Sequence, residues 1–189
     1  MNMLTINVTG HRPKRLDNAY DLTHPLNIQI GRVMRAFILE KAGYDEVKKS
    51  FSADLPVRLV TGMALGVDTV WAMVAIKLKQ QFPGVFELES AIPCAEHEKK
   101  FSKKDQERYH HILQNADVVT HVSRDRYKGY LMQKRNEYMV DISHAVFAVW
   151  DGVPSGGTYN CIAYAEKKER TIYKYFPKSD ATWSLYSGK

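Results

Sequence analysis

Apolar residues along this chain follow two alternating patterns: short continuous runs, and longer segments in which they recur every three to four positions. The short runs are typical of buried β-strands, and the longer segments are typical of amphipathic helices. We predict strands at 4–8, 57–60, 85–92, 117–122, 145–150 and 171–175, and helices at 24–43, 67–82, 96–115, 131–142 and 158–168. Because parallel strands need crossovers of about a dozen residues, this alternation predicts an α/β fold, with a mainly parallel sheet covered by helices on both faces.

Two stretches fall outside this pattern, the connection at 43–56 and the tail that begins after Pro177. Neither has the periodicity of a further domain. We therefore predict a single domain over residues 1–189, with its core at 4–175 and a C-terminal tail at 176–189. A chain of 189 residues with a hydrophobic share of 44% is large enough to bury one core.

The formal net charge of +6 raises the question of a nucleic-acid partner. Lysine pairs at 99–100, 103–104 and 167–168 lie in predicted helices and are interleaved with Asp and Glu, which is typical of solvated helix faces. We therefore expect no nucleic-acid partner. The positive charge would still attract small anions.

The sequence carries no metal or membrane signature. Cys94 and Cys161 lack neighbouring His or Cys residues at metal-ligand spacing, so no metal site is predicted. No run approaches the roughly 20 apolar residues of a membrane span, and a predicted strand stands where a signal peptide would lie. We expect a cytoplasmic protein without membrane contact, and the sequence leaves a homo-oligomer open.

Three glycine-containing loops each follow a predicted strand: TGHRP at 9–13, TGMALGVD at 61–68 and SGGTYN at 155–160. The second and third open predicted helices, whose first N–H groups are unpaired and lie at the positive end of the helix dipole. The first contributes Arg12, whose guanidinium can fork onto phosphate oxygens. Because ligands of parallel sheets bind at the carboxyl ends of the strands, the three loops predict a small phosphorylated, nucleotide-like ligand there.

Other phosphate-binding classes are excluded by spacing. Neither G-x-G-x-x-G nor G-x-x-x-x-G-K-[ST] occurs, which argues against NAD dehydrogenases and P-loop proteins, and no cofactor is predicted. Some loop residues also have a structural alternative. Asp68 could complement its helix dipole, Thr158 could be an N-cap, and His11 could bond only to nearby backbone. Tyr159 could stack on a base or pack in the core.

Further motifs carry a resemblance to a known family. Arg135–Asn136 and 139–141 (Met-Val-Asp) precede the fifth strand, and Trp150–Asp151–Gly152 leads into the third loop. In this order the motifs resemble the SLOG superfamily, and most of all its YpsA-like branch; the superfamily also includes the DprA proteins and the LOG phosphoribohydrolases. The resemblance implies a Rossmann-like three-layer sandwich with a nucleotide pocket at the carboxyl edge of the sheet. It implies ligand contacts from Gly10, His11, Arg12, Gly62, Met63, Gly66, Asp68, Arg135, Asn136, Asp141, Asp151, Gly156, Gly157, Thr158 and Asn160.

One departure from the LOG enzymes bears on activity. Their third loop resembles P-G-G-x-G-T-x-x-E, and here Cys161 stands in place of the glutamate that acts at the ribose. The missing carboxylate favours a module that senses or sequesters a nucleotide derivative such as ADP-ribose. Because Asp68 and Arg12 are present, a nucleoside-monophosphate N-glycosidase is the alternative hypothesis. Its first catalytic candidate is Asp68, followed by Asp141 and Asp151. Single-stranded DNA binding in the manner of DprA is a third hypothesis.

Overall fold

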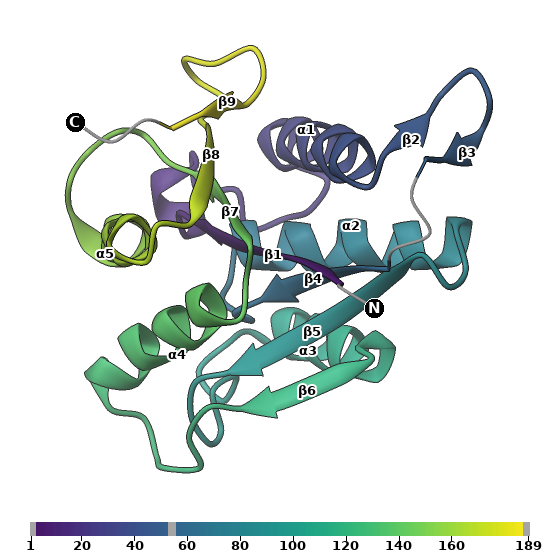
Figure 1. Ribbon diagram of the computed structural model, residues 1–189. Coiled ribbons are helices and arrows are strands. Elements are labelled where there is room, and N and C mark those ends of the chain that lie inside the picture. Colours follow the sequence, from purple (N-terminus) through teal and green to yellow (C-terminus); the bar gives the residue numbers. More distant parts are fainter. Residues whose placement is uncertain (1–2, 53–55, 187–189) are drawn as a thin grey trace.

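The computed structural model describes residues 3–52 and 56–186, and within them the main sheet has seven strands in the order β6-β5-β4-β1-β7-β8-β9 (Figure 1). The strands are β1 Leu4–Gly10, β4 Val57–Thr61, β5 Phe86–Ile92, β6 Val118–His121, β7 Ala145–Val149, β8 Thr171–Tyr175 and β9 Ser184–Leu185. All neighbours from β6 to β8 pair in parallel, and β9 pairs antiparallel with β8. The prediction of a mainly parallel sheet is confirmed.

Helices cover both faces of this sheet, as predicted (Figure 1). They are α1 Pro25–Lys41, α2 Val67–Gln81, α3 Lys103–Asn115, α4 Gly129–Asp141 and α5 Gly156–Lys167, with a short 3-10 turn η1 at Pro13–Arg15. Successive strand residues point to opposite faces. In β1, Ile6 and Val8 therefore join the core under α1, α2 and α3, whereas Thr9 faces α5 and hydrogen-bonds Cys161.

The strand order reverses beside β1. From β1 the chain builds β4, β5 and β6 outward on one side, and then crosses back to place β7 on the other side of β1. In open α/β sheets the crevice for a ligand lies at the carboxyl ends of the two strands where this reversal occurs. The topology therefore predicts a ligand site at the loops that follow β1 and β7.

The largest difference from the predicted elements lies before α3. We predicted a helix from Glu96, but residues 95–100 form turns, with Glu96 at a φ of 53°, and α3 begins at Lys103. The reason is the N-cap at Ser102, whose hydroxyl accepts a hydrogen bond from the Asp105 N–H at 3.2 Å. The segment 93–102 is therefore a loop at the carboxyl end of β5.

The two stretches without periodicity also gain structure. The predicted connection at 43–56 contains an antiparallel hairpin, β2 Tyr44–Asp45 and β3 Ser50–Phe51, whose aromatic rings pack at 4.9 Å. The tail contributes β9, and Trp183 packs against Phe37 at 5.6 Å. No helix in the described part of the chain combines the length and apolar character that a membrane crossing needs.

Phe37 of α1 is the centre of the larger core. It is fully buried, and its ring lies 4.6 Å from that of Phe147 and 5.0 Å from that of Tyr173. The side chain thereby joins α1, β7, β8 and the C-terminal tail. Aromatic pairs at these separations add to the free energy of burial.

We expect Phe37→Ala to lower the free energy of unfolding by about 3–5 kcal/mol, because it leaves a cavity between α1 and the sheet. Tyr127→Ala is the control, since the Tyr127 side chain is 66% exposed and its loss should change stability by less than about 0.5 kcal/mol. Urea unfolding of both variants measures the difference. Equal stabilities would show that Phe37 is not central to the core.

Candidate functional site

The three glycine loops meet at the carboxyl ends of β1, β4 and β7. The loop after β1 lies against the start of α2, where the Val67 N–H donates to the His11 carbonyl at 3.4 Å. On its other side, the Asp151 N–H donates to His11 Nε2 at 3.2 Å. His11 therefore joins the loop after β7 to the loop after β1, at the reversal of strand order.

Glycines of the first two loops are required by packing within the chain. A Cβ on Gly10 would lie 2.5 Å from a methyl group of Val67, and a Cβ on Gly66 would lie 2.8 Å from the His11 carbonyl oxygen. Gly66 also has a φ of +95°, which disfavours any other residue. At Gly62 a Cβ would overlap the guanidinium of Arg135. These glycines let chain segments approach one another.

The third loop is different, because its glycines face open space. A Cβ on Gly156 or on Gly157 would meet no atom within 4 Å. Ser155, the N-cap of α5, makes no side-chain hydrogen bond to the first turn, so the amides there are available to a ligand. Asn136 supports the turn, donating from Nδ2 to the Gly157 carbonyl at 3.4 Å. Thr158 is buried in the first turn.

In the loop that precedes α2, by contrast, two backbone donors are satisfied internally. The Ala64 N–H donates to Asp68 Oδ2 at 3.3 Å, and the Met63 N–H donates to Thr61 Oγ1 at 3.3 Å. The side chain of Met63 lies in the core. The loop before α2 therefore offers fewer free amides to an anion than its glycines suggest, although the N-cap of α2, like that of α5, makes no side-chain cap hydrogen bond.

Asp68 is held in a buried ion pair. Its Oδ2 lies 3.5 Å from Arg135 Nη1, and both side chains are less than 10% exposed. Arg135 also donates through Nη1 to the Gly62 carbonyl and through Nε to Asn136 Oδ1, the latter at 3.0 Å. Burial raises the pKa of Asp68, and the Arg135 guanidinium opposes that effect. The carboxylate is thus part of the scaffold that connects α4 to the β4–α2 loop.

His11, Asp151 and Arg15 form a second, more exposed group. Asp151 Oδ1 lies 3.1 Å from His11 Nε2, and Arg15 Nη2 lies 2.6 Å from Asp151 Oδ2. Burial lowers the pKa of His11, against the opposing field of Asp151. Burial pushes the pKa of Asp151 upward, but the Val153 N–H, His11 and Arg15 outweigh it and lower the pKa.

Arg12 has no such partner. It is exposed, and within residues 3–52 and 56–186 no carboxylate pairs with its guanidinium. Its positive charge nevertheless contributes to the lowered pKa of His97 and opposes the burial that raises the pKa of Asp68, so it lies within electrostatic reach of both. Among the described residues, Arg12 is therefore an unpaired cation at the carboxyl edge of the sheet.

Asp141 is not brought to this site. It ends α4, where Lys168 Nζ lies 2.9 Å from Oδ1, the Tyr164 hydroxyl donates at 3.2 Å and Arg170 donates to its carbonyl at 2.9 Å. The reason is topological: α4 starts after the carboxyl end of β6 and ends before the amino end of β7. Asn160 lies exposed further along α5.

His97 is a site residue that the sequence reasoning missed. It comes from the loop after β5, and burial, with Arg135 and Arg12 nearby, lowers its pKa to about 4. Its Nδ1 is buried without a hydrogen-bond partner among the described residues. Its position, five residues after the predicted strand at 85–92, could have indicated a loop residue at the carboxyl edge of the sheet. We instead predicted a helix from Glu96, which would have placed His97 inside that helix.

Cys161 lies beneath the site and not in it. Its side chain is fully buried in the core that α5 forms with β7. Burial raises the pKa of the thiol to about 11, so the group is neither a nucleophile nor an acid at neutral pH.

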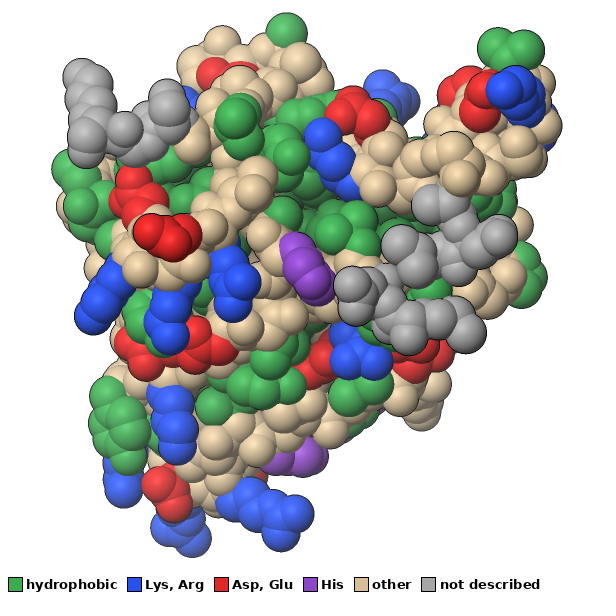
Figure 2. Space-filling model, viewed as in Figure 1, with side chains coloured by type: hydrophobic (Ala, Val, Ile, Leu, Met, Phe, Trp, Pro, Cys, Tyr) green, Lys and Arg blue, Asp and Glu red, His purple; other side chains and the backbone are tan. Residues whose placement is uncertain are grey.

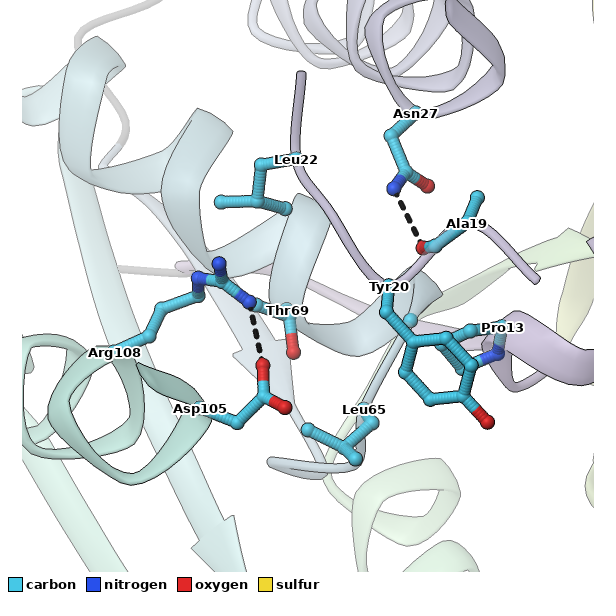
Figure 3. A pocket seen from close by; sticks show the side chains of 10 residues that line it. Pro13, Ala19, Tyr20, Leu22, Asn27, Leu65, Thr69, Asp105 and Arg108 are labelled. Atoms are coloured by element: carbon cyan, nitrogen blue, oxygen red, sulfur yellow. Dashed lines mark hydrogen bonds and ion pairs between the residues drawn. The ribbon is translucent and has the colours of Figure 1, made fainter. Parts of the chain in front are cut away.

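The far side of the α2 start is closed (Figure 3). Leu65 faces Asp105 and Arg108 of α3, which pair at 2.8 Å, and Asn27 Nδ2 donates to the Ala19 carbonyl at 2.8 Å. The cavity between them has a volume of about 10 Å³, which suits a single water molecule. This cavity is therefore too small for a nucleotide.

Comparison with known families decides the classification. The model of the YpsA family, described as the YspA SLOG family, matches residues 6–177. The chain belongs to this SLOG family. Among curated relatives, an uncharacterized SPbeta prophage-derived protein YoqJ of Bacillus subtilis strain 168 is 38% identical over 121 residues, 58% of this chain and 70% of that protein. A UPF0398 protein of Halalkalibacterium halodurans is 28% identical over 136 residues, 68% of this chain and 71% of that protein.

Solved structures with the same fold are DNA processing proteins. DprA of Streptococcus pneumoniae has a TM-score of 0.59 at 15% identity, over 91% of this chain and 50% of that one. DprA of Helicobacter pylori has a TM-score of 0.52 at 17% identity, over 90% of this chain and 64% of that one. This SLOG chain thus spans one half to about two thirds of the DprA chains, and at these identities the likeness concerns the fold.

We expect His97 to make this SLOG protein acid-sensitive. Between the ordinary pKa of 6.5 and the native value of about 4, the unfolded state binds a proton that the native state does not. This contribution to stability is therefore complete above about pH 6.5 and is lost as the pH falls towards about 4. The loss should reach about 3 kcal/mol near pH 4, at about 1.4 kcal/mol per pKa unit.

His97→Phe removes the titration and keeps ring contacts with Phe101 and Tyr109, which lie at 5.4 and 6.0 Å. Urea unfolding across this pH range should show that the free energy of unfolding of the variant increases relative to that of the native protein as the pH falls. Parallel stability curves for the two proteins would refute the assignment.

Proposed function

We propose that this protein binds a small phosphorylated nucleotide or nucleotide derivative, of the ADP-ribose kind, as a cytoplasmic sensor or sequestering protein. The observation that carries the proposal is the start of α5. Gly156 and Gly157 leave it open, no side chain caps it, and it follows β7 at the reversal of strand order. Such a helix start binds phosphate through its amides, and Arg12 supplies a free guanidinium.

The remaining site residues support binding more than cleavage. Asp68, the first catalytic candidate, is held by Arg135 and by the Ala64 N–H. Asp151 is held by Arg15, by the Val153 N–H and by its contact with His11. A carboxylate that stabilises a forming oxocarbenium ion has to face the sugar. The N-glycosidase therefore stays the alternative, with Asp68 as its catalytic residue.

A second candidate ligand, single-stranded DNA, is favoured by one observation. The loop after β6 and the start of α4 expose Tyr127 and Tyr130 by 66% and 59%, beside Arg124, Arg126 and Lys128. Figure 2 shows Lys and Arg side chains gathered at this lower left corner of the molecule. Exposed aromatic rings with cations suit unstacked bases and their phosphates. The Helicobacter pylori DprA structure describes a single-stranded DNA binding mode of that protein.

We expect ADP-ribose to raise the Tm, and adenosine to leave it unchanged, because the amides and Arg12 bind phosphate. At about 100 times Kd the shift should reach roughly 5 °C or more. Gly157→Val should abolish it by blocking the α5 amides. Gly129→Val is the matched control, since Gly129 also opens a helix and has an equally open Cβ position.

Differential scanning fluorimetry with these proteins decides among the outcomes. Equal shifts for ADP-ribose and adenosine would contradict phosphate binding. A shift with a single-stranded oligonucleotide and none with any nucleotide would favour the second candidate, and that shift should fall steeply with salt.

We expect no free base from AMP, CMP, dCMP or ADP-ribose after prolonged incubation with the protein. Chromatography of the reaction mixtures measures the base directly. Release that falls by about a hundredfold or more in Asp68→Asn, as on loss of one preorganised electrostatic group, would establish the N-glycosidase. Release that persists in Asp68→Asn would move the search for its catalytic residue to Asp151.

A further inference from the structure

A groove runs along the outer surface of α1 and α2, on the opposite face of the sheet from α5. Its volume is about 390 Å³. Both helices connect consecutive parallel strands, so they run in the same direction, side by side (Figure 1). The lining residues recur at helical spacing on each helix. They include Ile28, Gly31, Arg32 and Arg35 from α1, and Val70, Met73, Val74 and Lys77 from α2.

The floor of the groove is apolar. Ile28 is 42% exposed, and Met73 and Val74 are half-buried. Gly31 deepens the groove, because the space of its missing side chain is bounded by methyl groups of Val70 and Val74, which would lie 3.5 and 3.6 Å from a Cβ. Apolar side chains of a partner would leave water on entering this space.

The rim of the groove is cationic. Arg32 and Lys77 are exposed, and neither forms an ion pair within the described part of the chain. Arg35 donates to Gln81 Oε1 at 2.8 Å and has no carboxylate partner there. The three cations thus stand beside the apolar floor without a matching negative charge among the residues that the structure describes.

We propose that this groove binds an acidic amphipathic helix of a partner protein. In helix-in-groove complexes an amphipathic helix binds with its apolar face in a hydrophobic groove, such as the one between these two parallel helices. Glutamate side chains on the flanks of the bound helix would pair with Arg32, Arg35 and Lys77. A second copy docked through the same surface would oppose cation to cation, in a chain whose net charge is +6. An anionic membrane is flat and would not fill a concave floor. This proposal is independent of the nucleotide site.

The test uses a fluorescent helical peptide with leucine at positions i, i+3, i+4 and i+7 and glutamate on the flanking positions. Fluorescence anisotropy should show saturable binding to the 189-residue protein. Arg32→Glu/Lys77→Glu should weaken it by about tenfold or more, since about 1.4 kcal/mol corresponds to tenfold in Kd. Gly31→Leu should weaken it by filling the floor. Lys134→Glu/Lys167→Glu, exposed positions on α4 and α5, is the control of equal charge change and should bind as the native protein does.

Matched peptides define the specificity. Replacing glutamate with lysine, or leucine with serine, should abolish binding. The proposal is overturned if the acidic peptide does not bind, if both double variants weaken binding equally, or if Gly31→Leu binds unchanged. It is also overturned if anionic vesicles bind the protein through Arg32 and Lys77 while the peptide does not, or if the protein instead self-associates through this face.

Discussion

The buried guanidinium of Arg135 is the contact on which the carboxyl edge of the sheet depends. It reaches from α4 into the β4–α2 loop, where it donates to the Gly62 carbonyl and lies 3.5 Å from Asp68. Removing one partner of a buried pair typically costs about 3–5 kcal/mol, because the other charge is left unpaired at low dielectric. The close approach also explains Gly62, since a Cβ would overlap the guanidinium. Arg135 therefore fixes the floor of the site.

With this floor in place, the site divides into a closed part and an open part. The loop before α2 is closed, because Asp68 and Thr61 accept from two of its amides and α3 covers its far side. The start of α5 is open, since its glycines meet no neighbouring atom. The same residue type thus serves chain packing in the first two loops and exposes backbone donors in the third.

The sequence predicted the sheet and its helices well, because strand runs and helical periodicity are local signals. It could not distinguish Gly62 from Gly157, since the difference lies in Arg135, which is 73 positions from the former. Asp141 was placed among ligand residues by resemblance, but the direction of α4 carries it to the amino end of β7. His97 was missed because the cap at Ser102, which shortens α3, was not recognised. The contacts of Asp68 join residues far apart in the sequence, so the spacing of residue types along the chain does not report them.

The central claim is that a phosphorylated nucleotide binds at the open start of α5. Backbone amide NMR of the isotope-labelled protein during titration with ADP-ribose tests it residue by residue. We expect saturable shifts centred on 156–158, with smaller changes near Arg12, while the amides of Met63 and Ala64 stay almost unmoved because they are already hydrogen-bonded. Shifts centred on 62–68 with 156–158 unaffected, or shifts that never saturate, would contradict the account.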